Sequence, residues 1–240
     1  MATAANITYA SDQAFYRRMA VGIAVFILFG FLQFSARGFV NLGAIPIWVH
    51  LHALVFVGWL ALFVTQNILA ERGSLALHRR LGWWGAGLAA AMVVVGCFTA
   101  IKAIELGRQP PFFSPAYFLM LTQFGMLVFA GMITAALVLR RETQWHRRLL
   151  LAAMVLLLEP ALGRLLPMPL IGGETAEWYI LAIQLAVLAI AMRHDRKHWG
   201  KVHPALLWGA GVIALTHVVI SLGSKLPPVI ALAQSIAPAT

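Results

Sequence analysis

The chain has 240 residues, of which 61% are hydrophobic and 11% are charged, and its formal net charge is +10. Soluble domains contain roughly 25% charged residues, so this composition excludes a water-soluble globule. The high apolar content also excludes a disordered chain, and the single cysteine, Cys97, excludes a disulfide scaffold. The mean hydropathy of +0.84 favours an integral membrane protein.

Seven stretches are predicted as transmembrane helices, because a helix needs about 20 mostly apolar residues to cross the hydrocarbon core. In chain order they are 19–35, 46–70, 81–103, 112–139, 149–166, 178–192 and 204–223. The fifth stretch is interrupted by Pro160, which is expected to bend it. Since backbone polar groups in lipid must be bonded within their own segment, we expect an all-α polytopic membrane domain over residues 19–223. Residues 1–18 and 224–240 are expected to be a cytoplasmic N-terminal segment and a periplasmic C-terminal tail.

The basic residues are distributed unevenly between the two ends of these seven helices. Thirteen of the 18 Lys and Arg residues fall on the side of the N-terminus: Arg17, Arg18, Arg72, Arg79, Arg80, Arg140, Arg141, Arg147, Arg148, Arg193, Arg196, Lys197 and Lys201. Five fall on the other side: Arg37, Lys102, Arg108, Arg164 and Lys225. The positive-inside rule then places the N-terminus in the cytoplasm and the C-terminus outside a bacterial inner membrane. The charge of +10 therefore indicates orientation and contact with anionic lipid, with no nucleic-acid partner.

Three of the predicted loops end in similar motifs, LHRRL at 77–81, WHRRL at 145–149 and VHPAL at 202–206. Each motif places a histidine where an outward-running helix begins. Parallel repeats related by an axis along the membrane normal are a known plan in membrane proteins. We therefore expect one first helix followed by three parallel helical hairpins.

Polar residues within the predicted spans are costly in lipid and point to function by default. At a rise of 1.5 Å per residue, eight such residues fall in one layer in the outer half of the membrane, roughly 20–27 Å from the cytoplasmic edge. They are Gln33, Arg37, His50, His52, Gln123, Glu159, Arg164 and His217. Because polar groups avoid the lipid face, we expect them to converge inside the bundle.

The first functional hypothesis is the binding of haem b, with a role in membrane electron transfer or haem biology. Haem in a helical bundle needs two imidazoles on facing helices at matched depth and cations near its propionates. His217 with His50 or His52 would supply the outer pair of ligands. The two latter histidines are two residues apart, hence about 200° apart on a helix, so which of them faces the bundle interior is left open.

A second, inner haem would place its ligands near the cytoplasmic ends of the helices. His203 and His217 are 14 residues apart, nearly four helical turns, so they share one face. His78 or His146 would complete the inner site. The full set of candidate cofactor-binding residues, including two arginines for the propionates, is His50, His52, His78, His146, His203, His217, Arg37 and Arg164.

Two other classes of function stay open. An intramembrane zinc-dependent hydrolase would hold its metal with histidine and carboxylate ligands, which activate a bound water. The candidate zinc ligands are His50, His52, His217 and Glu159. Alternatively, Glu159, Arg164 and the proline-broken helix would form a proton or anion path in a carrier, transporter or assembly subunit. Such a chain would contact the lipid bilayer and a membrane-protein partner or a second copy of itself.

Three segments carry a resemblance to a known group of proteins. They are VHLHALVFVGWLALFV at 49–64, LHRRLGWWGAG at 77–87 and WHRRLLLAAMVLLLEPALGRLLP at 145–167. These segments resemble bacterial multi-span membrane proteins of uncharacterised activity, which are loosely similar to families linked to cytochrome oxidase or haem biogenesis. The resemblance implies a multi-span helical fold with membrane histidines and a distant connection to haem, and it implies no specific activity.

Overall fold

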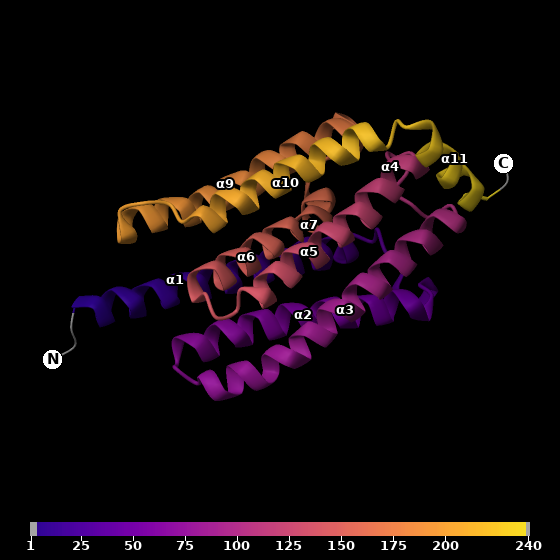
Figure 1. Cartoon of the computed structure of the whole chain (residues 1–240). Helices are drawn as coiled ribbons and strands as arrows, with labels where there is room; N and C mark the ends of the chain where they lie inside the picture. The colour runs from indigo at the N-terminus through magenta and orange to yellow at the C-terminus, as the bar shows by residue number, and fades with distance from the viewer. Residues whose placement is uncertain (1–3, 239–240) are drawn as a thin grey trace.

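The computed structural model describes residues 4–238, and all the secondary structure in that part of the chain is helical (Figure 1). The helices are α1 (Ala4–Ala36), α2 (Ile47–Glu71), α3 (Leu75–Glu105), α4 (Pro115–Leu119), α5 (Gly125–Val138), α6 (Thr143–Leu156), α7 (Glu159–Leu165), α8 (Met168–Ile171), α9 (Gly173–Trp199), α10 (Pro204–Gly223) and α11 (Pro227–Ile236). A short 3-10 turn, η1 (Leu42–Ala44), precedes α2, and a π-helical turn, η2 (Met120–Phe124), joins α4 to α5.

Six helices in the described part of the chain are long and apolar enough to cross a membrane. They are Ser11–Ala36, Ile47–Glu71, Leu75–Glu105, Pro115–Val138, Gly173–Trp199 and Pro204–Gly223. The expectation of an all-helical, multi-pass membrane protein is thereby supported. Several helices run beyond the predicted apolar stretches because their polar ends continue the same hydrogen-bonded ladder outside the apolar core. Residues 4–18, for example, form the first part of α1, and α11 lies within the segment expected to be a tail.

The predicted fifth span, 149–166, is divided between α6 and α7. Every side chain from 151 to 158 is buried, whichever way it points around the axis. A helix that is covered on all faces is surrounded by protein, so this segment is the central element of the bundle. The break follows from Pro160, which has no N–H to donate to the carbonyl of Leu156. The bend predicted at Pro160 is confirmed.

The helices form hairpins that pack side by side (Figure 1). The loops that join α2 to α3, α5 to α6 and α9 to α10 all lie at the end of the bundle that holds the N-terminus. The α2–α3 hairpin packs against α1 and α5, and α10 packs against α6 and α9, with α6 in between. The α2–α3 and α9–α10 hairpins therefore lie on opposite sides of the central helix. The opposite end of the bundle holds α4, α11 and the C-terminus.

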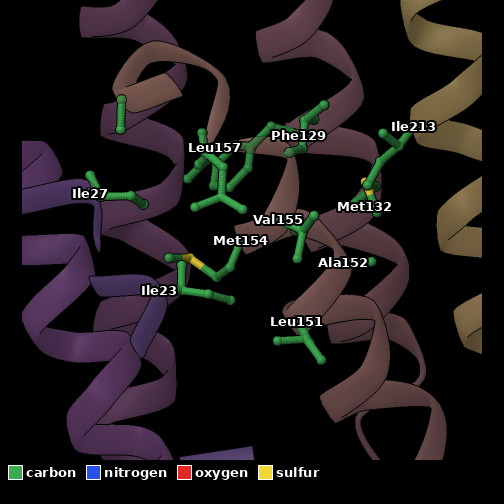
Figure 2. Packing of buried hydrophobic residues seen from close by; sticks show 14 of the residues in the cluster. Ile23, Ile27, Phe129, Met132, Leu151, Ala152, Met154, Val155, Leu157 and Ile213 are labelled. Atoms are coloured by element: carbon green, nitrogen blue, oxygen red, sulfur yellow. The ribbon is translucent and has the colours of Figure 1, made fainter. Parts of the chain in front are cut away.

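The core is centred on α6 (Figure 2). Side chains of α6 and of the turn after it, including Met154 and Leu157, lie between Ile23 and Ile27 of α1 on one side and Phe129 of α5 on the other. Trp59 of α2 donates its indole N–H to the Met154 sulfur at 3.0 Å. Lipid provides no hydrophobic driving force between helices, so tight van der Waals packing and small residues hold them together.

Candidate functional site

A buried polar cluster joins α9 to α10 in the half of the bundle that holds α4 and α11. His217 of α10 is 2% exposed, and Glu177 and Gln184 of α9 are fully buried. Glu177 and Gln184 are seven residues apart, about two helical turns, so they lie on one face of α9. The His217 ring lies between them: its Nδ1 is 2.7 Å from Glu177 Oε1, and its Nε2 is 2.7 Å from Gln184 Oε1.

The break between α6 and α7 orients this cluster. Because Pro160 cannot donate to the Leu156 carbonyl, that carbonyl needs another donor, and Gln184 Nε2 supplies it at 3.1 Å. The Gln184 amide nitrogen is thus directed to Leu156, which leaves its oxygen to face His217. A carbonyl oxygen only accepts, so His217 Nε2 must carry a hydrogen.

The protonation of the remaining contact follows from this assignment. With a hydrogen fixed on His217 Nε2, the imidazole is neutral when Nδ1 is bare and cationic when Nδ1 is protonated. A proton at this contact would lie either on Glu177, which gives a neutral pair, or on Nδ1, which gives an ion pair. Their 2.7 Å contact does not have the angles of a hydrogen bond, and both Glu177 oxygens lack a hydrogen-bond partner. The pair keeps unused hydrogen-bonding capacity, unlike a saturated structural ion pair.

Two further groups lie beside this pair. The buried Tyr117 hydroxyl on α4 lies beside Glu177, and Glu159 and Glu174 are within its electrostatic reach. Glu159 begins α7 and lies within electrostatic reach of Glu177 and Arg164. Tyr117 lies three residues before the π turn η2, and π turns inside helices occur frequently at functional sites. Four helices therefore bring titratable groups together at one level of the bundle.

The arginines predicted for this layer are close to each other through Gln33. Arg37 donates to Gln33 Oε1 at 3.3 Å, and Gln33 Nε2 donates to the backbone carbonyl of Arg164 at 3.1 Å. The Arg164 guanidinium donates to the Pro160 carbonyl at 2.7 Å and lies 4.1 Å above the Phe31 ring. Among the described residues no carboxylate oxygen lies within 4 Å of either arginine.

The structure does not bring the histidines of α2 to His217. His50 is exposed, whereas His52 is partly buried and stacks on Phe56 with ring centroids 4.2 Å apart. His52 is therefore the one that faces protein. However, α2 and α10 lie on opposite sides of α6, so equal depth does not place His52 beside His217 (Figure 1). Both ring nitrogens of His217 also have protein oxygens at 2.7 Å.

The histidines of the first two loop motifs share one local geometry. His78 Nδ1 is 3.2 Å from the Gln66 carbonyl, and His146 Nδ1 is 2.8 Å from the Ala136 carbonyl. Each histidine thus ties the start of one helix to the end of the preceding helix, with its hydrogen on Nδ1. The two rings lie edge to face with centroids 6.4 Å apart. The third motif differs, because His203 Nδ1 accepts the Ala205 N–H and caps α10.

The zinc ligand set expected from the sequence is not assembled. In the described part of the chain, no group of three or more His, Cys, Asp or Glu residues has the geometry to hold a metal ion. The ligands proposed for it were His50, His52, His217 and Glu159, and the positions of α2 and α10 explain why they do not meet.

A second polar network, which the sequence analysis missed, lies at the end that holds the N-terminus. Asp12 and Asp195 are the only aspartates of the chain, and both are fully buried. Asp195 receives two hydrogen bonds from Arg148, at 2.8 and 2.5 Å, and one from the His203 backbone N–H at 3.1 Å. Asp12 pairs with Arg147 and lies 2.9 Å from His194 Nε2.

Two basic residues of this network are buried and paired, contrary to what their motif suggests. Arg147 and Arg148 were counted among the cations that set the orientation, yet Arg148 is 1% exposed and both are paired with aspartates. The signal available in the sequence was the rarity of aspartate, since two aspartates in such an apolar chain imply specific partners. Glu177 and Gln184 had a similar signal in their seven-residue spacing along a short apolar stretch.

The fold and the buried cluster define a multi-helix membrane protein with a titratable site inside its bundle. No family model, curated protein sequence or solved structure matches this chain. The resemblance to multi-span membrane proteins linked to haem biogenesis therefore stays a prediction that rests on the three quoted segments.

Proposed function

We propose that this protein is a proton-linked membrane carrier that binds and releases a proton at the Glu177–His217 pair. The observation that carries the proposal is the His217 ring, buried between Glu177 and Gln184 beside a break in the central helix. Ionisable groups inside a bundle mark ion pathways and proton relays, and broken helices near such groups are typical of carriers. The proton path that the sequence predicts through Glu159 and the proline-broken helix is part of this proposal.

The orientation belongs to the same proposal. Residues 143–165 cover about 34 Å along a helix axis, so α6 and α7 together serve as a seventh span. With seven spans the N-terminus lies in the cytoplasm and the C-terminus outside a bacterial inner membrane. Without the paired Arg147 and Arg148, 11 of the 13 cations on the N-terminal side remain, against five on the other. The positive-inside rule therefore still favours this orientation.

The apolar core below the cluster supports a carrier over an open channel. Gln184 and Asp195 on α9 are 11 residues apart, about 16 Å along the axis. Between them, Leu188 and Ala191 are fully buried in the apolar core. Along α9, apolar side chains thus separate the His217 cluster from Asp195. A second proton on the pair would leave a net positive charge in an apolar interior, which is costly, so protonation favours a rearrangement at the α6–α7 break.

Proton uptake into proteoliposomes, driven by a potassium diffusion potential, tests the proposal. We expect Glu177→Gln and His217→Asn to slow uptake at least ~10-fold, since each removes a group that shares the proton. The matched control is His50→Asn, because His50 is an exposed histidine outside the cluster, and its uptake should equal that of the unmodified chain. Uptake that is unchanged in both cluster variants, or absent in the unmodified chain, would overturn the proposal.

A second candidate function is haem b binding at the inner end. The observation that favours it is the His78–His146 pair, whose Nδ1 atoms are held by backbone carbonyls. This second contact fixes the ring and leaves Nε2 for a metal, as in many histidine ligands. An absorption spectrum of the purified protein tests it. A Soret band that shifts on reduction and disappears in His146→Ala would support haem there, and a colourless protein from haem-replete cells would exclude it.

A further inference from the structure

A pocket of about 330 Å³ opens at the end of the bundle that holds α4 and α11. Its polar lining comes from Ser114 before α4, Glu174 of α9, Ser224 and Lys225 after α10, and Gln234 of α11. Glu174 is 51% and Lys225 63% exposed, and their charged atoms are 3.8 Å apart. With a water molecule filling ~30 Å³ in the liquid, the pocket has room for several waters.

The segments that line this pocket continue directly into the buried cluster. Glu174 precedes Glu177 by three residues, so both lie on one face of α9, about 5 Å apart along the axis. Ser114 precedes Tyr117 by three residues and accepts its backbone N–H at 3.2 Å. Ser224 follows His217 by seven residues, about two turns. The pocket therefore lies one to two helical turns from the cluster along each of three helices.

The carboxylates of α9 become less exposed to solvent from the pocket towards the buried cluster. The Glu174 side chain is 51% exposed, whereas that of Glu177 is 1% exposed. The unpartnered Tyr117 hydroxyl lies within electrostatic reach of both carboxylates. A hydroxyl accepts one hydrogen while it donates another, so it can join the two acids without carrying a charge. Lys225 balances the charge of Glu174 when Glu174 is ionised.

We propose that this pocket is the aqueous mouth of the proton site and that Glu174 is its entry carboxylate; the inference rests on the proposed proton function. A hydronium ion in the pocket gives its proton to the Glu174 carboxylate and becomes water. The resulting carboxylic acid donates to the Tyr117 oxygen as the Tyr117 hydroxyl donates to Glu177. Glu174 is restored as a carboxylate, the tyrosine stays neutral, and the proton reaches the Glu177–His217 pair.

Blocking the pocket with a charged label tests the mouth. In a Cys97→Ala background, Gln234→Cys places a thiol in the pocket lining, and the neighbouring Ser235→Cys places an equally exposed thiol of α11 outside that lining. Both variants are labelled in detergent with a trimethylammonium methanethiosulfonate, checked by mass spectrometry and reconstituted. We expect labelling at position 234 to slow potential-driven proton uptake by roughly 10-fold, because a fixed cation at a mouth repels protons. Labelling at position 235 should leave the rate unchanged.

Glu174 is tested by substitution in the same assay. Glu174→Gln should slow uptake by roughly 10-fold, and Glu174→Asp, which keeps the carboxylate, should restore most of the rate. If the unlabelled background takes up protons and full labelling at position 234 has no effect, the pocket is not the aqueous mouth. The proposed proton function is unaffected by that result. If Glu174→Gln conducts normally, Glu174 is not the entry group. If the unlabelled background takes up no protons, the proposed function and this inference both fail.

Discussion

The two buried polar networks of this protein differ in how completely their charges are matched. At the end that holds the N-terminus, Asp195 receives two hydrogen bonds from the Arg148 guanidinium and one from the His203 backbone. In the other half, Glu177 lies 2.7 Å from His217 outside hydrogen-bond geometry, with the buried Tyr117 hydroxyl beside it and no lysine or arginine of the described residues paired with it. Asp195 and Glu177 are both fully buried, so burial alone does not separate a structural group from a functional one.

The number of hydrogen bonds that a buried carboxylate receives determines how it behaves. A carboxylate with a bidentate guanidinium partner is held in one protonation state and one position, which suits a joint between α6, α9 and the start of α10. A carboxylate beside an imidazole can exchange a proton with it, so the pair has two possible protonation states. The first arrangement stabilises a fold, and the second is the arrangement that the proposed proton function requires.

Removing Arg148 is expected to cause the largest loss of stability. Arg148→Met leaves Asp195 as a fully buried, unpaired charge, which costs roughly 3–5 kcal/mol. Thermal unfolding in detergent micelles measures the effect, with Arg79→Met as the control because Arg79 is exposed. Adding Asp195→Asn to Arg148→Met should recover much of the loss, since it removes the stranded charge and keeps an acceptor for the His203 N–H. If the unfolding midpoint of Arg148→Met is no lower than that of Arg79→Met, the Arg148–Asp195 pair does not stabilise the fold and the contrast between the two networks is wrong.

The sequence predicts those features of the fold that depend on residues close together in the chain. Apolar length predicted the spans, and the missing N–H of Pro160 predicted the break that gives Gln184 its role. Depth along each helix was also readable, and it placed Glu159 and His217 in one layer. Which helices are neighbours within that layer depends on packing, so His52 and His217 share a depth and still lie on opposite sides of α6.

The residues of the second network were missed because their partners are distant in the chain. Asp12 and Arg147 are 135 residues apart, and no local pattern connects them. Arg147 and Arg148 sit in a motif that resembles an exposed one at Arg79 and Arg80, so a repeat in sequence concealed a difference in burial. Glu177 lies just before the apolar stretch 178–192 and was therefore not counted as a residue within the membrane.

Gln184→Leu tests whether the break at Pro160 and the polar cluster act together. Alone, this substitution strips the Leu156 carbonyl of its donor, which is expected to cost about 1–3 kcal/mol. In a Pro160→Ala background the new N–H at position 160 serves that carbonyl, so the same substitution should cost less. The lost contact to His217 is common to both backgrounds and cancels in the cycle. Unfolding free energies of the four chains give the coupling, and a coupling near zero would show that Gln184 is not held by the break.

The smallest effect concerns pH at the His203 cap, which lies in the loop between α9 and α10 and outside the spans. Burial, with a contribution from the positive charge of Arg148, lowers the pKa of His203 below its usual range. The unfolded chain then binds more protons than the folded one just below pH ~6.5, so stability falls as the pH drops through that value. Unfolding midpoints at pH 7.5 and 5.5 should differ by less in His203→Asn, which keeps a capping oxygen for the Ala205 N–H, than in the unmodified chain. Other histidines act equally in both proteins, so identical pH slopes would show that His203 titrates in the fold as it does in the unfolded chain.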